Sequence, residues 1–151
     1  MNFFIAEAPN KIFVQLGFEK LEEVKDKYTR RGGHYFLASD QINGKPHWLQ
    51  EDGFGSHELS AIWFYKNPDD QRMWVIGNVT SLGESWRDSG VDFRGLFDIV
   101  NQEEEYEQDP SQDPTQVNNK DWEYWHNDAW HKTTSEIKLH PVRYSGKLVF
   151  A

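Results

Sequence analysis

The chain contains no cysteine, and this absence excludes several classes of protein at once. A disulfide framework, catalysis by a thiolate, and zinc or iron–sulfur centres with thiolate ligands all need that residue. The absence fits the cytoplasm, but it is equally compatible with a secreted protein whose signal peptide was removed. A soluble, cytoplasmic protein is therefore the default prediction for localisation, and secretion stays open.

The sequence also lacks long apolar runs and strong clusters of basic residues. No stretch approaches the ~20 apolar residues of a membrane-spanning helix, so we predict no membrane insertion. The 16 Lys and Arg residues face 25 Asp and Glu residues, which gives a net charge of −9. This charge repels a phosphate backbone, and the one basic cluster, at 25–31, is short and interrupted. We therefore predict no nucleic-acid partner.

Aromatic residues, in contrast, are plentiful and make up 15% of the 151 residues. Large rings supply core area that the modest aliphatic content does not. A chain of this length normally forms one compact domain, so we predict a single β-rich domain over residues 1–151. Residues 101–120 are rich in Asp, Glu and Pro and contain almost no apolar side chains. They predict a long, solvated acidic loop within that domain.

Several short segments show the period-two alternation of β-strands. Residues 11–17 alternate and end at a glycine, and residues 135–140 alternate in the same way. Residues 60–66 and 72–77 are bulky at nearly every position, and the turn-forming segment 67–71 joins them, which predicts a β-hairpin. The residues predicted to lie in the core are Val14, Ile62, Phe64, Trp74 and Ile76.

The remaining segments predict turns, loops and at most one helix. Helical spacing over residues 18–27 allows one short helix, and residues 28–36 are interpreted as two β-prone pieces around a Gly-Gly turn. The Asn-Gly pair at 43–44 is a strong turn signal, and Pro46 confines the segment after it to an edge strand or a strand start. Residues 83–97 are predicted to be a loop. The fold class is therefore all-β, a mostly antiparallel β-sandwich or compact barrel-like roll.

The densest aromatic segment is DWEYWHNDAWH, residues 121–131. If residues 126–129 connect two strands of a hairpin, Trp125 lies opposite Trp130, and a Glu123–Lys132 charge pair shares their face. The opposite face then carries Trp122, Tyr124 and His131. A hairpin with aromatic residues on both faces is either buried on both sides or buried on one side and used for binding on the other.

Three interpretations of this hairpin are open. The favoured one is structural: the rings seal the core, with Trp130 buried. In the second, Trp122 and Tyr124 face a planar or sugar-like ligand that covers them. In the third, His126 and His131 bind a metal, but no third ligand lies at a familiar spacing, so we predict neither a metal nor another cofactor. The candidate ligand-binding residues are Trp122, Tyr124, His126 and His131.

No catalytic motif is recognisable, and no catalytic residue is predicted. Gly53–Glu58 combines glycine, serine and histidine but lacks the Gly-x-Ser-x-Gly elbow. Asp88, Asp92 and Asp98 do not have the spacing of an EF-hand calcium loop. An enzyme would require histidines to converge with a carboxylate in a cleft. The histidines available for this are His34, His47, His57, His126 and His131.

Four short motifs succeed one another along the chain: INGKPHW at 42–48, AIWF at 61–64, WVIG at 74–77, and the tryptophans 122 and 130. Their order resembles that of a small all-β module of larger eukaryotic extracellular or signalling chains. In that module an Asn-Gly-x-Pro-x-aromatic turn precedes an aromatic hairpin, a Trp-x-Ile-Gly strand and a late tryptophan pair. The resemblance implies a non-catalytic module. The acidic insertion and the lack of cysteine depart from its pattern.

Together these observations favour a non-enzymatic binding or interaction module that contacts a protein or a glycan through exposed aromatic residues. Two alternatives belong to other classes. One is a small-molecule carrier with an aromatic-lined cavity inside a β-barrel, which requires a closed barrel with an internal void. The other is a small hydrolase that uses His together with Asp or Glu.

Overall fold

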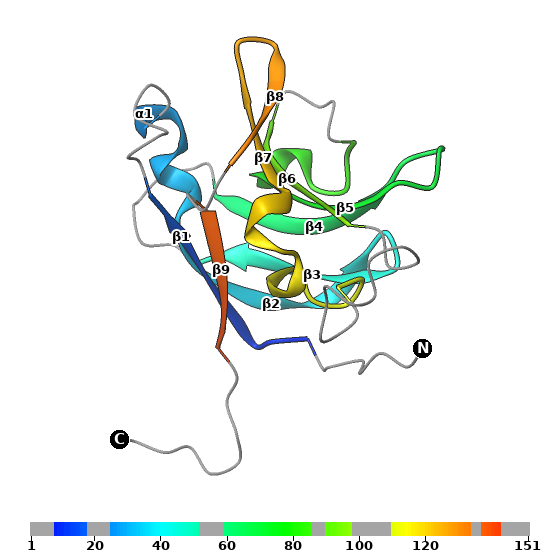
Figure 1. Ribbon diagram of the computed structural model, residues 1–151. Helices are drawn as coiled ribbons and strands as arrows, with labels where there is room; N and C mark the ends of the chain where they lie inside the picture. Colours follow the sequence, from blue (N-terminus) through cyan, green and yellow to red (C-terminus); the bar gives the residue numbers. More distant parts are fainter. Residues whose placement is uncertain are drawn as a thin grey trace.

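A computed structural model describes most of the chain, namely residues 8–17, 25–51, 59–85, 90–97, 110–133 and 137–142. Strands dominate it (Figure 1). The strands are β1 (Lys11–Leu16), β2 (Gly33–Ile42), β3 (Lys45–Gln50), β4 (Ser60–Lys66), β5 (Arg72–Asn78), β6 (Val91–Phe97), β7 (Trp122–His126), β8 (Ala129–Lys132) and β9 (Ile137–Val142). The helical turns are α1 (Lys25–Tyr28), η2 (Thr29–Arg31), η3 (Val79–Ser81), η4 (Pro114–Gln116) and η5 (Asn119–Asp121). Predictions that concern Gly53–Glu58, Asp88 or Asp98 lie outside the described residues.

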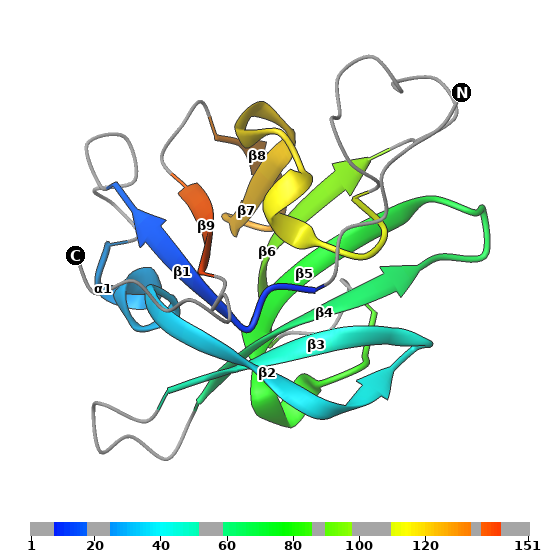
Figure 2. The same ribbon diagram turned by 90° about the horizontal axis from the view of Figure 1, so that it is seen from below.

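The strands form one nine-stranded sheet in the order β8-β7-β6-β5-β4-β3-β2-β1-β9. Every pair in it is antiparallel, and β9 returns at the end of the chain to pair with β1. The sheet curls into a half-barrel around the η4 and η5 segment, with β8 and β9 as its edges (Figures 1 and 2). The predicted all-β, antiparallel, barrel-like fold is confirmed.

The larger core fills the concave side of the sheet. The rings of Trp48 and Phe64 pack edge-on against Trp74, at centroid distances of 5.7 and 5.5 Å. Both indoles are hydrogen-bonded: Nε1 of Trp48 donates to the Pro9 carbonyl at 2.8 Å, and Nε1 of Trp74 donates to the Pro110 carbonyl at 2.6 Å. The five residues predicted for the core all lie in this cluster: Val14, Ile62, Phe64, Trp74 and Ile76.

A smaller core lies on the convex side. Ala61, Trp63, Met73, Val75 and Val91 form its buried centre. The connection from β5 to β6 contacts it, because Nε1 of Trp63 donates to the Glu84 carbonyl at 3.1 Å. Strands β4 and β5 are therefore buried on both faces. This explains why their sequences are apolar at nearly every position instead of alternating.

Residues 110–117, part of the segment predicted to be a solvated loop, are packed instead, whereas Asn119 and Lys120 are exposed. Asp113 is buried, and its Oδ1 accepts hydrogen bonds from the backbone N and the Oγ1 of Thr115 at 2.9 and 2.6 Å. Val117 is buried in the concave core. Solvation was the wrong prediction for this part because local hydrogen bonds satisfy its polar groups. Residues 101–109 lie outside the described residues.

Strand β6 occupies residues that were predicted to be a loop. Its glycine serves close packing: a Cβ at Gly95 would lie 2.9 Å from the Trp122 ring. Gly77 on β5 is similarly tight, because a Cβ there would lie 2.4 Å from the Gly90 carbonyl oxygen. The pairing register also shifts between Ile76 and Gly77, so that Phe93 lies in the concave core while Val91, two residues earlier, lies in the convex core.

Of the other local predictions, some are confirmed and one is wrong. The Asn-Gly turn is confirmed: Asn43 and Gly44 have positive φ angles of 55° and 79° and join β2 to β3. Pro46 lies near the start of β3, as predicted. Residues 28–31, predicted to be β-prone, end α1 and form η2 instead, while β2 starts at Gly33. Among the described residues no helix has the length and apolarity to cross a bilayer.

Candidate functional site

The aromatic hairpin has the predicted register. Trp125 lies opposite Trp130 and Glu123 lies opposite Lys132. The two indoles meet edge to face at a centroid distance of 5.3 Å. The loop is shorter than the predicted four residues, because His126 pairs with Ala129. Asn127 and Asp128 alone make the turn, with positive φ angles of 51° and 59° that these two residue types tolerate.

The face that carries Trp122, Tyr124, His126 and His131 runs from the core to the surface. Trp122 is only 1% exposed and belongs to the concave core, so the expectation that it faces a ligand is wrong. Its ring packs over Gly95, where the missing side chain leaves room for it. Tyr124 is half-buried against the same core. Of the four candidate residues, three remain accessible.

The two hairpin histidines lie together near the tip. The ring of His131 stacks on Tyr124 at a centroid distance of 5.4 Å and lies 6.0 Å from the ring of His126. Nε2 of His131 is 2.8 Å from the His126 carbonyl oxygen, so this ring nitrogen is used within the hairpin. No group of three or more potential metal-binding residues occurs in the described part of the chain.

The opposite face of the hairpin is tied to β6. The Arg94 guanidinium lies 4.5 Å from the centroid of the Trp130 ring, and its Nε lies 2.7 Å from Oε1 of Glu123. The predicted charge partner of Glu123 was Lys132, but Arg94 forms this ion pair. Trp130 is half-buried against the convex core, not fully buried as predicted. This face is part of the scaffold.

One end of the half-barrel is closed by a buried ion pair. Arg31 and Asp92 are 1% and 2% exposed, and their Nε and Oδ2 atoms are 2.7 Å apart. Arg31 also donates to Oγ of Ser60 at 2.9 Å. Gln50 Nε2 donates to the Arg30 and Gly32 carbonyls. Asp92 was considered as an oxygen ligand for calcium, but its pairing with a guanidinium gives it a structural role.

Two tyrosines complete this closed end. The hydroxyl of Tyr35 donates to the Arg31 carbonyl at 2.6 Å, and the hydroxyl of Tyr28 donates to the Trp125 carbonyl. Burial raises the pKa of both phenols well above the ordinary value of about 10. The negative charge of Asp92 adds to this shift in both cases.

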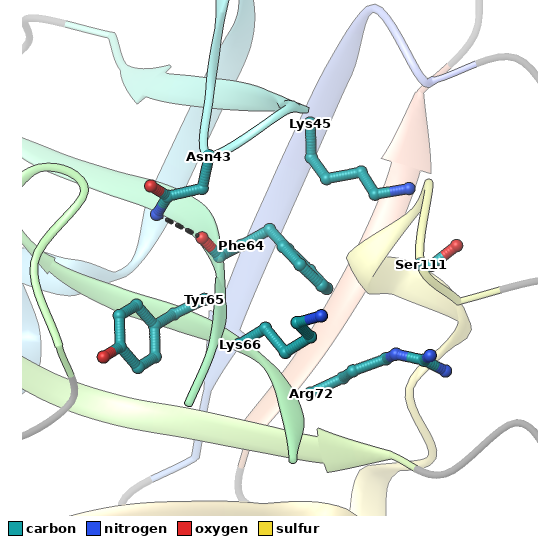
Figure 3. Close-up of a pocket in the computed structure, with 7 residues that line it drawn as sticks. All are labelled: Asn43, Lys45, Phe64, Tyr65, Lys66, Arg72 and Ser111. Carbon is teal, nitrogen blue, oxygen red and sulfur yellow. Dashed lines mark hydrogen bonds between the residues drawn. The ribbon is translucent and has the colours of Figure 1, made fainter. Parts of the chain in front are cut away.

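The opposite end of the same strands is open and holds a pocket of about 670 Å³, within the range of small-molecule sites. Two hairpins and the segment before η4 line it. Figure 3 shows Lys45, Arg72 and Ser111 extending toward the side to which the Phe64 ring points, while the Tyr65 ring points the other way. We call this the rim pocket, and its lining residues are Asn43, Lys45, Phe64, Tyr65, Lys66, Arg72 and Ser111.

The rim pocket is strongly cationic. Lys66 and Arg72 are direct cross-strand partners on β4 and β5, an arrangement of like charges that is unfavourable for a sheet. Nζ of Lys66 lies 3.2 Å from Oδ1 of Asp70 in an exposed ion pair. Nζ of Lys45 lies 5.7 Å from the centroid of the Phe64 ring. Within the described part of the chain, no carboxylate forms an ion pair with Lys45 or Arg72.

The walls of the rim pocket are held in place by hydrogen bonds. Asn43 Nδ2 donates to the Phe64 carbonyl at 2.8 Å and to the Gly83 carbonyl at 3.2 Å, which fixes the β2–β3 turn against β4 (Figure 3). Ser111 comes directly after Pro110, whose carbonyl accepts the bond from the Trp74 indole. The pocket is thus formed by the folded scaffold before any ligand arrives.

Sequence reasoning missed this pocket because its lining residues come from separate turns. The one signal available was the basic residue on each side of the predicted hairpin loop, Lys66 and Arg72. Two of the histidines considered for catalysis lie elsewhere: Nε2 of His47 is 3.8 Å from Oδ1 of Asp40, and His34 packs on Phe13. Among the described residues, neither a histidine nor a carboxylate lines the rim pocket.

No protein-family model matches the chain, and no curated protein or solved structure is significantly similar to it. The functional argument therefore depends on the chemistry of the sites themselves.

Proposed function

We propose that the protein is a non-enzymatic binding module and that the rim pocket holds a small organic anion. The observation that carries this proposal is the convergence of Lys45, Lys66 and Arg72 around the Phe64 ring. Cations that line one concave site focus a positive potential into it and attract anions. Guanidinium and ammonium groups form short, charge-assisted hydrogen bonds to carboxylate, sulfate and phosphate oxygens.

The overall charge strengthens this argument. The chain carries a net charge of −9, whereas the rim pocket, with three cations and one paired carboxylate, has a positive local charge. The sign of the charge at this site is therefore opposite to that of the whole molecule. The like-charge pair of Lys66 and Arg72 does not stabilise the sheet. Binding of an anionic ligand, which would neutralise this pair, explains the two adjacent positive charges better than a contribution to folding stability does.

The pocket combines elements of two hypotheses drawn from the sequence. The carrier hypothesis required a closed barrel with an internal void, whereas the described sheet has two edges and aromatic rings fill its concave side, so a small-molecule site is proposed at the rim instead. A glycan partner fits the rim pocket only if it carries an acidic or sulfated group, because three of the seven lining residues are cations. A hydrolase is disfavoured by the lack of a histidine or a carboxylate among the described residues that line the pocket.

The test compares two probes of nearly equal shape, benzoate and benzamide. Nuclear magnetic resonance titration to about 10 mM covers the roughly millimolar Kd that such small fragments reach. Benzoate should shift the resonances of residues around the rim pocket, and benzamide should not. Lys45→Met and Arg72→Met should abolish the shifts, while Lys138→Met, an exposed change on β9, should leave them intact. Equal shifts from both probes would contradict an anion site.

A second candidate binding surface is the accessible part of the aromatic hairpin. Tyr124, His126 and His131 share one face and none of them is fully buried, which supports contact with a protein or a glycan. Glycan-array binding of the wild type and of Tyr124→Ala tests this surface. Loss of a signal in Tyr124→Ala, with the signal retained in Arg72→Met, would assign the glycan to the hairpin. No difference between Tyr124→Ala and wild type would exclude this surface.

A further inference from the structure

The charge balance of the rim pocket points to the class of its ligand. Three cations line the pocket, and one of them, Lys66, is paired with Asp70 at 3.2 Å. Three positive charges less one negative charge leave a local charge of +2 among the described residues. A ligand with one negative charge would leave half of this charge uncompensated in a partly enclosed site.

The other two cations differ in kind and come from different hairpins. Lys45 begins β3, and its amine is a compact point charge with three donors. Arg72 begins β5, and its guanidinium offers a planar fork of donors that suits two oxygens at once. Figure 3 shows both groups on the side of Phe64 that faces Ser111. A ligand with more than one negative charge is attracted by both cations.

The floor of the pocket is apolar. The Phe64 ring is 6% exposed, and Trp74 and Phe97 support it from below at centroid distances of 5.5 and 6.3 Å. Tyr65 also lines the pocket, but its ring points away from Phe64 (Figure 3) and packs against the convex core. A flat or apolar substituent can rest on the Phe64 ring while the anionic group lies between Lys45 and Arg72.

We infer that the rim pocket selects a doubly charged organic anion, such as a phosphate monoester or a geminal dicarboxylate, over a singly charged one of the same shape. This inference rests on the proposed function and specifies its ligand. The added selectivity comes from Lys45 and Arg72 acting together, because a second negative charge gains a second charge-assisted contact.

Phenyl phosphate and phenyl sulfate form the test pair, because they share their shape while the phosphate ester carries about two negative charges near pH 7.5 and the sulfate one. Isothermal titration should give a Kd for phenyl phosphate that is lower by about tenfold or more, the value of one charge-assisted contact. Phenylmalonate and phenylacetate repeat the comparison with carboxylates. Whichever dianion binds more tightly identifies the preferred group, and a preference for either over its monoanion supports the inference.

Variants link this selectivity to the two cations. Arg72→Met should reduce the preference for phenyl phosphate to about twofold or less, and Arg72→Lys should restore part of it. Asp70→Asn releases Lys66 from its ion pair and should tighten the binding of phenyl phosphate; Asn tolerates the positive φ of 66° at this position.

The outcomes separate this inference from the proposed function. Equal affinities for phenyl phosphate and phenyl sulfate would overturn the dianion inference and leave an anion site in place. No binding of any anionic probe would overturn both. A preference that persists unchanged in Arg72→Met would place the selective site elsewhere and overturn the inference.

Discussion

Charged residues lie beside both ends of strands β3 and β4, and their surroundings differ between the two ends. At the closed end Arg31 is buried and meets Asp92, Ser60 and the hydrogen-bonded frame around Gln50. At the open end Lys45 and Arg72 line a pocket, and no described carboxylate pairs with them. A charge that is fully buried needs a counter-charge from the same chain, because water cannot solvate it. A charge at the mouth of a pocket is solvated by water and can be neutralised later by a ligand. The first arrangement is structural and the second is suited to binding.

The largest effect should come from breaking the buried ion pair. Asp92→Asn leaves the Arg31 guanidinium buried without its counter-charge and should lower the free energy of unfolding by about 3–5 kcal/mol. Urea denaturation measures this loss. The double variant Arg31→Met, Asp92→Leu removes both charges and should recover a large part of the stability. A loss below about 1 kcal/mol in Asp92→Asn would mean that the closed end is not held by this pair.

Trp122 extends the comparison from charges to rings. Because its side chain is buried over Gly95, Trp122→Ala should lower the free energy of unfolding by about 3–5 kcal/mol. Tyr124→Ala, one step further along the same face, should cost clearly less because that ring is only half-buried. Urea midpoints of the two variants test whether the loss of stability is larger at the buried position than at the half-buried one. Similar midpoints would show that the hairpin is uniformly part of the core or uniformly outside it.

The tyrosines of the closed end should make the protein less stable at alkaline pH. The pKa values of Tyr28 and Tyr35 are raised by burial, so above about pH 10 the unfolded chain loses protons that the folded chain keeps. Stability is unaffected below that pH and should then fall with rising pH, by about 1.4 kcal/mol per pH unit for each tyrosine. Urea midpoints between pH 8 and 11 measure the slope. Tyr35→Phe should flatten it, and an unchanged slope would contradict this assignment.

The smallest effect on stability is expected at the open end. Lys45→Met and Arg72→Met should change the free energy of unfolding by about 0.5 kcal/mol or less, because neither residue makes an ion pair in the described structure. Removing Arg72 should even relieve its repulsion with Lys66. Thermal denaturation beside the binding titrations checks both properties. A loss comparable to that of Asp92→Asn would mean that the two ends do not differ in kind.

Much of the scaffold could be predicted from sequence because it depends on local chemistry. The turn residues between β4 and β5, the Asn-Gly turn and the Trp125–Trp130 register all depend on residues close in sequence. Strand β6 was missed because Gly90, just before it, and Gly95, within it, resemble turn residues, although Gly95 makes room for a ring from β7. The packing of residues 110–117 was missed because polar groups are satisfied there by partners that composition does not reveal.

The candidate site was harder to predict for a related reason. Trp122 and Tyr124 have the same local pattern, and only the curl of the sheet decides which of them reaches the core. The rim pocket brings Lys45, Arg72 and Ser111 together from three segments far apart in the chain. No spacing rule links such residues, so the site appears only when the strands are in register.

The contact between Phe64 and Trp74 gives the molecule an optical readout. Trp74 is fully buried, lies directly beneath the pocket floor, and donates its indole N–H to the carbonyl next to Ser111. A ligand that presses on Phe64 or draws on Ser111 changes the immediate surroundings of this one indole. Its fluorescence can therefore report occupancy of the rim pocket without any attached dye, and Trp74→Phe separates its signal from that of the other six tryptophans.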